Sequence, residues 1–198
     1  MRVFVSGPSG VGKTTVIKEV LRKNPDLVLS VSYTTRAPRK DEQDGVDYFF
    51  VSRDTFEDMV RKGAFLEWAN VHGNLYGTSI EWVEEMESRG FHVLFDIDVQ
   101  GVKQAKEKGL QGCFILIVPP TIDELERRLH SRGTEDRDSL VRRMENARAE
   151  LAMWNLYDYL VVNDSLLECI ETVHAVILAQ RASKSEMIGR LPWLHTIA

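Results

Sequence analysis

An eight-residue stretch near the N-terminus, GPSGVGKT from Gly7 to Thr14, has residue types and a spacing that could surround a phosphate group. It fits the pattern G-x-x-x-x-G-K-[ST], and it lies between the strand-like run VFVS and a predicted helix over 13–23, which is the context this motif requires. The glycines let backbone N–H groups turn toward a phosphate, and the helix N-terminus adds partial positive charge. We therefore expect Lys13 to reach the β- and γ-phosphates of a nucleotide and the Thr14 hydroxyl to hold Mg²⁺. An ordinary glycine-rich turn is the alternative.

Two acids follow a second buried run, in the stretch LFDID. A phosphate loop of this kind needs a metal-positioning acid at the end of a neighbouring strand. Asp96 and Asp98 are two residues apart, so on a predicted strand over 92–98 they would face the same side. We expect Asp96 to position Mg²⁺ together with Thr14. Asp98 to Gly101 also fits the D-x-x-G of GTPases, but the chain has no N-K-x-D motif to read guanine, and we discount that function.

A third acid, Glu67, lies in the predicted strand over 64–71. Alternation along a strand places it on one face with Phe65, Ala69 and Val71, among which it is the only polar side chain. A buried carboxylate without a partner is costly. The pattern therefore indicates a partner for Glu67 without identifying it.

The elements that must position these residues alternate between strand-like and helical, which predicts an α/β fold with a mostly parallel central sheet flanked by helices. Strands are predicted at 3–6, 45–51, 64–71, 92–98, 113–118 and 159–162. Helices are predicted at 13–23, 53–62 and 79–89, from a capping box at Thr121 to Glu124, and from Ser165. The segment from about 183 is expected to be either a frayed helix or a tail docked through Leu191 and Trp193.

Composition limits the partners. The 198 residues carry a net charge of -5, so affinity for nucleic acid or acidic membranes is not expected, and no stretch is apolar for long enough to span a bilayer. Positive charge gathers in RAPRK (36–40) and in 127–148, where seven arginines outnumber four acids, which suggests a small anionic ligand. Cys113 and Cys169 have no metal-ligand spacing, and no signal peptide is expected before the first strand. We therefore expect free thiols and a cytoplasmic location.

Longer motifs now converge on a family. The stretches GPSGVGKTT, SYTTRAPR, DGVDYFF, FLEWANVHGNLYGTS, FDIDVQG and HSRGTEDRDSLVRRM together resemble those of the guanylate kinases, P-loop enzymes among the nucleoside monophosphate kinases. The resemblance runs from about Val3 to the helix after Asn163. It implies ATP-dependent phosphorylation of GMP, and of dGMP, to GDP in purine nucleotide metabolism, with Mg²⁺ as the cofactor. It also implies one domain over 1–198, divided into a core (1–31, 81–127 and 150–198), a GMP-binding lobe (32–80) and an arginine-rich lid (128–149).

The resemblance also implies roles for individual residues. ATP would be bound by Gly7, Pro8, Ser9, Gly10, Val11, Gly12, Lys13, Thr14 and Thr15. Asn163 would contact the base of ATP. The substrate would be bound by Ser32, Arg36, Arg39, Tyr48, Glu67, Tyr76, Thr78 and Asp98. The catalytic set would be Lys13, Arg36, Arg128, Arg132 and Arg143, and Mg²⁺ would be held by Thr14 and Asp96, partly through water.

Some of these residues have simpler explanations. Thr78 could instead cap a helix together with Glu81, the arginine-rich segment could be a solvated helix face, and RAPRK could be a solvated loop. The sequence departs from the family at Tyr33 and Leu75, which puts affinity rather than activity in question.

Two other functions remain open. A kinase of the same fold could act on another phosphorylated acceptor, such as a ribose bisphosphate, but it would not need Glu67, Thr78 and Asp98 together. A non-catalytic guanylate-kinase-like module could bind a phosphopeptide, but such modules typically lack the intact phosphate loop that this chain has. Monomeric and homo-oligomeric states are both open.

Overall fold

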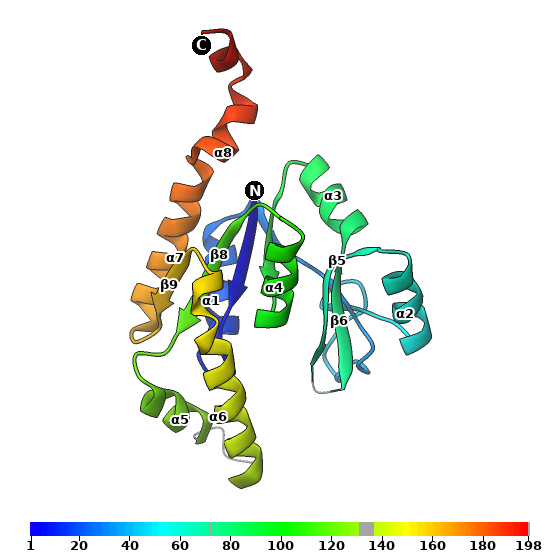
Figure 1. Cartoon of the computed structure of the whole chain (residues 1–198), viewed down its shortest axis with the longest axis vertical. Coiled ribbons are helices and arrows are strands. Elements are labelled where there is room, and N and C mark those ends of the chain that lie inside the picture. Colours follow the sequence, from blue (N-terminus) through cyan, green and yellow to red (C-terminus); the bar gives the residue numbers. More distant parts are fainter. Residues whose placement is uncertain (72, 131–136, 198) are drawn as a thin grey trace.

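A computed structural model describes residues 1–71, 73–130 and 137–197, and Figure 1 shows two sheets with helices around them. The larger sheet has five strands in the order β2-β7-β1-β8-β9, and every neighbouring pair is parallel. The smaller sheet has four strands in the order β4-β3-β6-β5. The predicted α/β fold with a parallel central sheet is confirmed.

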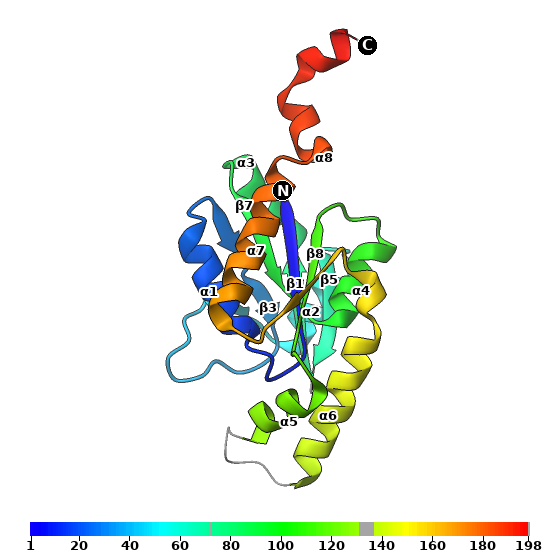
Figure 2. The same ribbon diagram turned by 90° about the vertical axis from the view of Figure 1, so that its left-hand side faces the viewer.

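The central sheet is covered by helices on both faces. Its strands are β1 (Arg2–Ser6), β2 (Leu27–Leu29), β7 (His92–Asp96), β8 (Cys113–Val118) and β9 (Tyr159–Val162). The covering helices are α1 (Lys13–Lys23), α3 (Ile80–Ser88), α4 (Val99–Glu107) and α7 (Leu166–Arg181). Alternation along β1 explains the two layers, because Val3 and Val5 pack with α1 and α7, whereas Phe4 packs with α3 and α4. Figure 2 shows α1 and α7 in front of the sheet.

The smaller sheet lies to one side of this core (Figure 1). Its strands are β3 (Ser32–Thr34), β4 (Tyr48–Phe50), β5 (Phe65–Val71) and β6 (Asn74–Ser79), and α2 (Arg53–Arg61) packs on it. Phe56 of α2 stacks on Phe65 with ring centroids 4.5 Å apart, and both pack with Leu75. The small sheet therefore has a hydrophobic cluster of its own.

Two more helices lie beyond the carboxyl ends of the central strands, α5 (Ile122–His130) and α6 (Arg137–Ala152), followed by the 3-10 turn η1 (Trp154–Leu156). The predicted cap of α5 is confirmed, because the Glu124 N–H donates to Thr121 Oγ1 at 3.1 Å. After α7 the chain continues through α8 (Lys184–Met187), η2 (Ile188–Arg190) and η3 (Pro192–Thr196), which project from the body in Figures 1 and 2. Trp193 is 56% exposed, so the expectation of a tail docked through it is wrong.

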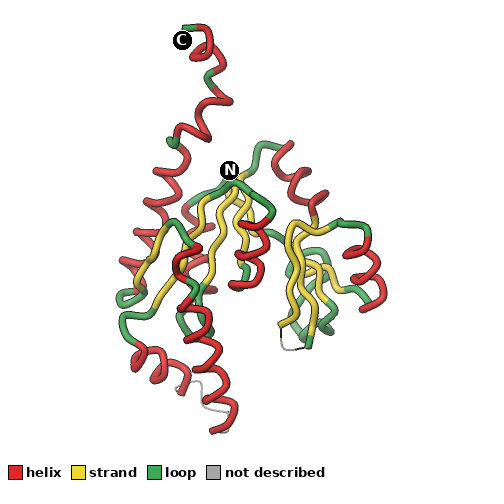
Figure 3. The backbone as a smooth tube through the Cα atoms, in the orientation of Figure 1, coloured by secondary structure: helices red, strands yellow, loops and turns green. Residues whose placement is uncertain are grey.

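Several boundaries differ from the prediction. Figure 3 colours the helices, strands and loops of the structure. The strand predicted at 45–51 is confined to Tyr48–Phe50, because Gly45 adopts a φ of 74° in a turn before it. The strand predicted at 92–98 ends at Asp96, and Asp98 begins α4 by accepting a hydrogen bond from the Gly101 N–H at 2.9 Å. Asp96 and Asp98 therefore do not share a strand face, and that prediction is wrong. The strands β2, β3 and β6 and the helix α4 were not predicted.

Candidate active site

The loop between β1 and α1 has the backbone that the sequence motif predicted. Gly10 and Gly12 adopt φ values of 87° and 96°, in the left-handed region that favours glycine. A Cβ at Gly7 would come within 2.6 Å of the Ile117 carbonyl oxygen. At Gly12 it would come within 2.6 Å of Asn163 Nδ2. Three glycines are therefore required by conformation or by space, and the loop opens onto the N-terminus of α1.

Asn163 lies behind this loop and braces it. Its side chain is buried, and Nδ2 donates to the Val11 carbonyl oxygen at 2.7 Å. Arg128 Nη1 donates to the Asn163 carbonyl oxygen at 2.9 Å, and Arg128 Nε donates to Glu124 at 2.6 Å. In this structure Asn163 thus supports the loop backbone, and Arg128 joins α5 to the end of β9. The sequence did not indicate that the Asn163 amide supports the loop. The family resemblance implied a contact with the base of ATP instead.

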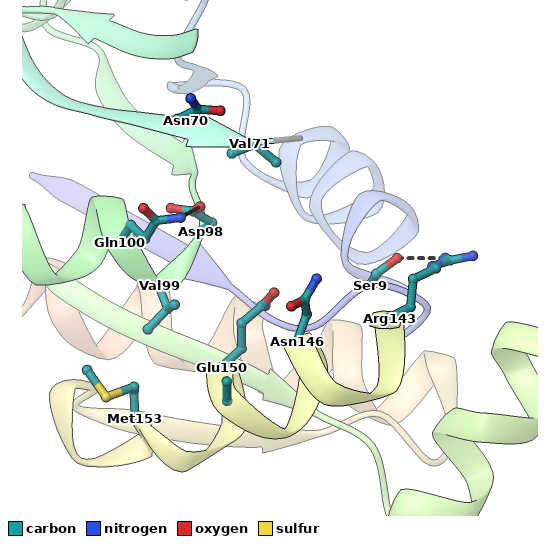
Figure 4. A pocket seen from close by; sticks show the side chains of 11 residues that line it. Ser9, Asn70, Val71, Asp98, Val99, Gln100, Arg143, Asn146, Glu150 and Met153 are labelled. Carbon is teal, nitrogen blue, oxygen red and sulfur yellow. Dashed lines mark hydrogen bonds between the residues drawn. The ribbon is translucent and has the colours of Figure 1, made fainter. Parts of the chain in front are cut away.

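The two charged residues expected at the phosphates and the metal meet directly. Asp96 ends β7, the strand beside β1, and Val5 lies opposite it in the sheet. Lys13 Nζ donates to Asp96 Oδ1 in an ion pair. From α6, Arg143 Nη2 donates to Ser9 Oγ at 2.7 Å, as Figure 4 shows. Arg132, the remaining arginine of the predicted catalytic set, lies outside the described residues.

The basic group after β3 is held by an acid that the sequence interpretation missed. Arg36 Nη2 donates to Glu42 Oε1 at 2.8 Å, and the Arg39 N–H donates to the other oxygen of Glu42 at 2.8 Å. The Arg36 guanidinium carbon lies 5.3 Å from the centre of the Tyr48 ring, which is an edge-on neighbour of Tyr76 at 5.9 Å. The hydrogen bond from Arg36 keeps the pKa of Glu42 below its ordinary value. In the sequence, the position of Glu42 six residues after Arg36 could have indicated this ion pair.

Four polar residues from three elements and a helix cap form what we call the carboxylate wall: Ser32, Glu67, Thr78 and Asp98. Glu67 is only 4% exposed, and Thr78 Oγ1 donates to its Oε1 at 2.6 Å. Ser32 Oγ lies 3.4 Å from Thr78 Oγ1. Burial raises the pKa of Glu67 to about 7, the Thr78 hydrogen bond opposes that rise, and the charge of Asp98 adds to it.

The alternative role of Thr78 as a helix cap is wrong. Ser79 is the N-cap of α3, and its hydroxyl accepts from the Trp82 N–H at 3.4 Å. The Thr78 hydroxyl is directed at Glu67 instead. The N-cap of α3 therefore lies one residue later than predicted, at Ser79 instead of Thr78.

A cleft of about 240 Å³ brings most of the expected substrate residues together. It is lined by Lys13, Ser32, Tyr48, Glu67, Ala69, Val71, Tyr76, Gly77, Asp96, Ile97 and Asp98. A second cleft of about 480 Å³ shares Val71 and Asp98 with the first and reaches Ser9 and Arg143 (Figure 4). The two clefts together connect the carboxylate wall to the phosphate loop.

Glu150 of α6 lines the larger cleft and was missed by the sequence interpretation. Burial raises its pKa to about 7, the charge of Asp98 adds to the rise, and the charge of Lys13 opposes it. In Figure 4 its side chain projects from α6 into the cleft. No recognisable motif surrounds Glu150 in the sequence.

Comparison with known proteins gives a consistent result. The guanylate kinase family model matches residues 1–180. The guanylate kinase of Geobacter metallireducens is 47% identical over 178 residues, which is 90% of this chain and 88% of that protein. The guanylate kinase of Sphingopyxis alaskensis is 47% identical over 186 residues, covering 93% and 84%. Among solved structures, a guanylate kinase from Anaplasma phagocytophilum superposes with a TM-score of 0.72 at 31% identity, covering 93% of this chain and 87% of that one.

Proposed function

The chain belongs to the guanylate kinase family, and we propose that it transfers the γ-phosphoryl group of ATP to GMP, forming ADP and GDP. The observation that supports this most strongly is the position of Glu67, a buried carboxylate on the same cleft as Lys13 of the phosphate loop. The curated relatives named guanylate kinase cover most of this chain.

Glu67 explains how the acceptor would be selected. The edge of guanine presents two neighbouring donors, N1–H and the 2-amino group, and an ionised carboxylate can accept from both. Adenine presents no such pair. Thr78 fixes the carboxylate, and Ser32 and Asp98 lie beside it. The wall is therefore suited to guanine.

The phosphates of the two nucleotides would be held at the two ends of the clefts. Arg36, Arg39, Tyr48 and Tyr76 would hold the GMP phosphate, since guanidinium forks and phenol hydroxyls both donate to phosphate oxygens. Lys13 and the loop amides would hold the β- and γ-phosphates of ATP. The acceptor oxygen is largely ionised at neutral pH, so the reaction needs no general base and depends on alignment and charge stabilisation.

The residues present fit a magnesium ion accompanying ATP. The Thr14 hydroxyl and the Asp96 carboxylate are hard oxygen donors, and Asp96 lies beside Lys13 at the phosphate loop. Within the described part of the chain, no group of three or more histidine, cysteine or acidic residues could hold a metal by itself. An ion here would depend on the phosphates as well. Bound Mg²⁺ would neutralise charge between the β- and γ-phosphates.

We assign the moving parts by the same reasoning. Residues 32–80 would form the GMP-binding lobe, 128–149 the lid, and 1–31, 81–127 and 150–198 the core. Arg143 already reaches the loop at Ser9, and lid closure would bring Arg128 and Arg132 toward the transferring phosphoryl group. Closure would also exclude water as a competing acceptor.

A cytoplasmic location fits a reducing environment, because Cys113 and Cys169 are free and buried. Among the described residues, no helix is long and apolar enough to cross a membrane.

A coupled assay of ADP release with GMP, dGMP, AMP, CMP and UMP as acceptors tests the proposal. Turnover should be confined to GMP and dGMP. Preference for another acceptor would remove the role given to Glu67, and tight phosphopeptide binding without ATP turnover would support the non-catalytic alternative.

A further inference from the structure

The strand that contains Glu67 is the edge of the smaller sheet. β5 pairs with β6 on one side only, and its pairing shifts register between Phe65 and Glu67. An edge strand leaves backbone groups unpaired along its outer side, and a bulge disrupts the ladder further. The backbone on both sides of Glu67 therefore needs partners from outside the sheet.

Those partners are two side chains of α4 and the loop that follows it. The Trp68 N–H donates to Gln104 Oε1 at 3.2 Å, and Gln104 Nε2 donates to the Trp68 carbonyl oxygen at 2.5 Å. Lys108 Nζ donates to the carbonyl oxygens of Leu66 at 2.7 Å and Phe65 at 3.2 Å. Gln104 thus pairs with the strand as a neighbouring strand would, and the four bonds lie on both sides of Glu67.

The first turn of α4 also touches Glu67. A Cβ at Gly101 would lie 2.8 Å from Glu67 Oε2, so the carboxylate packs directly against the helix backbone. Asp98, another member of the carboxylate wall, is the N-cap of the same helix. Val102 and Ala105 fix α4 on the central sheet, where both are fully buried. One helix therefore determines where Glu67 lies relative to Asp98 and the core.

We propose that Gln104 and Lys108 are positioning residues for guanine selection, which hold the bulged segment of β5 so that Glu67 points into the cleft. Neither residue lines that cleft. The inference rests on the proposed function, since it assumes that Glu67 reads guanine. A displacement of about 1 Å at a binding group can reduce a reaction about a hundredfold, so a loose strand would weaken GMP recognition while leaving the ATP side intact.

Charge gives Lys108 a second effect on the same carboxylate. The charged groups that act on Glu67 are Asp98, which raises its pKa, and Lys108, which lowers it. Removing the Lys108 ammonium should therefore move the ionisation of Glu67 to higher pH. A purely structural contact would leave the pH profile in place.

Three variants test the proposal. Gln104→Leu removes both bonds to Trp68, Lys108→Met keeps the aliphatic stem without the ammonium, and Lys108→Arg restores the charge. The matched control is Lys103→Ala, on an exposed position of the same helix where the lysine pairs with Glu107 at 3.9 Å. Thermal melts establish that each variant is folded before kinetics are measured with ATP and GMP across pH 6–9.

We expect Gln104→Leu and Lys108→Met each to raise the KM for GMP about tenfold, as the loss of one or two hydrogen bonds predicts, with kcat and the KM for ATP within about twofold of wild type. The rise of kcat/KM for GMP with pH should shift upward in Lys108→Met and return in Lys108→Arg. If Gln104→Leu fails to fold, the comparison of Lys108→Met with Lys108→Arg tests the positioning role. A GMP KM unchanged in the folded variants, in an enzyme that still prefers GMP and still depends on Glu67, would overturn the positioning role alone. An enzyme without preference for GMP would instead overturn the proposed function.

Discussion

The phosphate loop and the carboxylate wall face the same cleft, but they are built in opposite ways. The loop is one continuous stretch, Gly7 to Thr14, in which backbone geometry does most of the work and left-handed glycines are braced by Asn163. The wall is made of side chains from β3, β5, β6 and the cap of α4, and its central group is a buried carboxylate. One site is a local backbone structure, and the other exists only once distant elements have packed.

This difference predicts different energetics. Backbone N–H groups and a helix N-terminus can be turned toward a phosphate without burying charge. Glu67 is held out of water before any ligand arrives, and its pKa is raised by burial for that reason. The wall therefore stores a cost that a guanine base, with its two donors, would relieve. Perturbing each site separately tests this contrast.

A substitution in the phosphate loop should reduce activity most. Lys13→Ala should lower kcat by at least about a hundredfold, because a positioned charge at the transferring phosphoryl group is removed. GMP binding, measured by calorimetry, should stay within a fewfold of wild type, since the wall is untouched. Loss of GMP binding equal to the loss of turnover would show that the two sites are not separate.

The next effect is at the wall. Glu67→Gln replaces one acceptor oxygen with a donor that faces the donors of guanine. It should raise the KM for GMP by about ten- to a hundredfold, the range expected for a charged hydrogen bond, with the KM for ATP unchanged. Steady-state kinetics with each substrate varied in turn measures both. Equal changes in the two KM values would mean that Glu67 supports the fold rather than the base.

The same substitution, Glu67→Gln, should increase the stability of the unliganded protein although it weakens the binding of GMP. The pKa of Glu67 rises from its ordinary 4.5 to about 7 on folding, so its favourable contribution is fully present below pH 4.5 and is lost as pH rises through 7. The ionised carboxylate then costs the folded, unliganded protein about 3 kcal/mol. Glu67→Gln should therefore unfold at higher urea than wild type at pH 8.5, with a smaller difference at pH 5. A variant less stable than wild type at pH 8.5 would contradict the stored cost.

The smallest effect expected is at the hydroxyl that holds the carboxylate. Thr78→Val keeps the shape of the side chain but removes its donor to Glu67, so the KM for GMP should rise about three- to tenfold. The kcat/KM for GMP should also need higher pH, because the Thr78 bond lowers the pKa of Glu67. Thr121→Val, at the exposed cap of α5 away from the wall, serves as the control for loss of a threonine hydroxyl bond.

The contrast also explains how much the sequence revealed. The loop and the parallel sheet could be predicted because each depends on neighbours in the chain, such as the glycines around Val11 and the apolar run of β8. The wall could be predicted only through resemblance to a family, since nothing local joins Ser32, Glu67 and Asp98. Strand alternation showed Glu67 as a charged residue on an apolar face, but it did not identify the partner of the carboxylate.

What the sequence did not reveal depends on packing. The strand β3 has three residues, too few for a period to show, and β6 contains Gly77 and polar residues. By alternation, Asp98 would continue the strand predicted over 92–98, but its side chain caps α4. The bonds from Gln104 and Lys108 to β5 span 36 and 42 positions of the chain, so no local pattern records them. The bulge before Glu67 appears only once β5 pairs with β6.

In the proposed reaction, Glu67 selects the acceptor base. The most direct measurement is kcat/KM for GMP, IMP and AMP in the wild-type enzyme and in Glu67→Gln, with ATP held saturating. IMP keeps the N1–H donor and lacks the 2-amino group, so the wild-type enzyme should prefer GMP over IMP and IMP over AMP. In Glu67→Gln the preference for GMP over AMP should fall at least about tenfold. An unchanged preference would contradict the account.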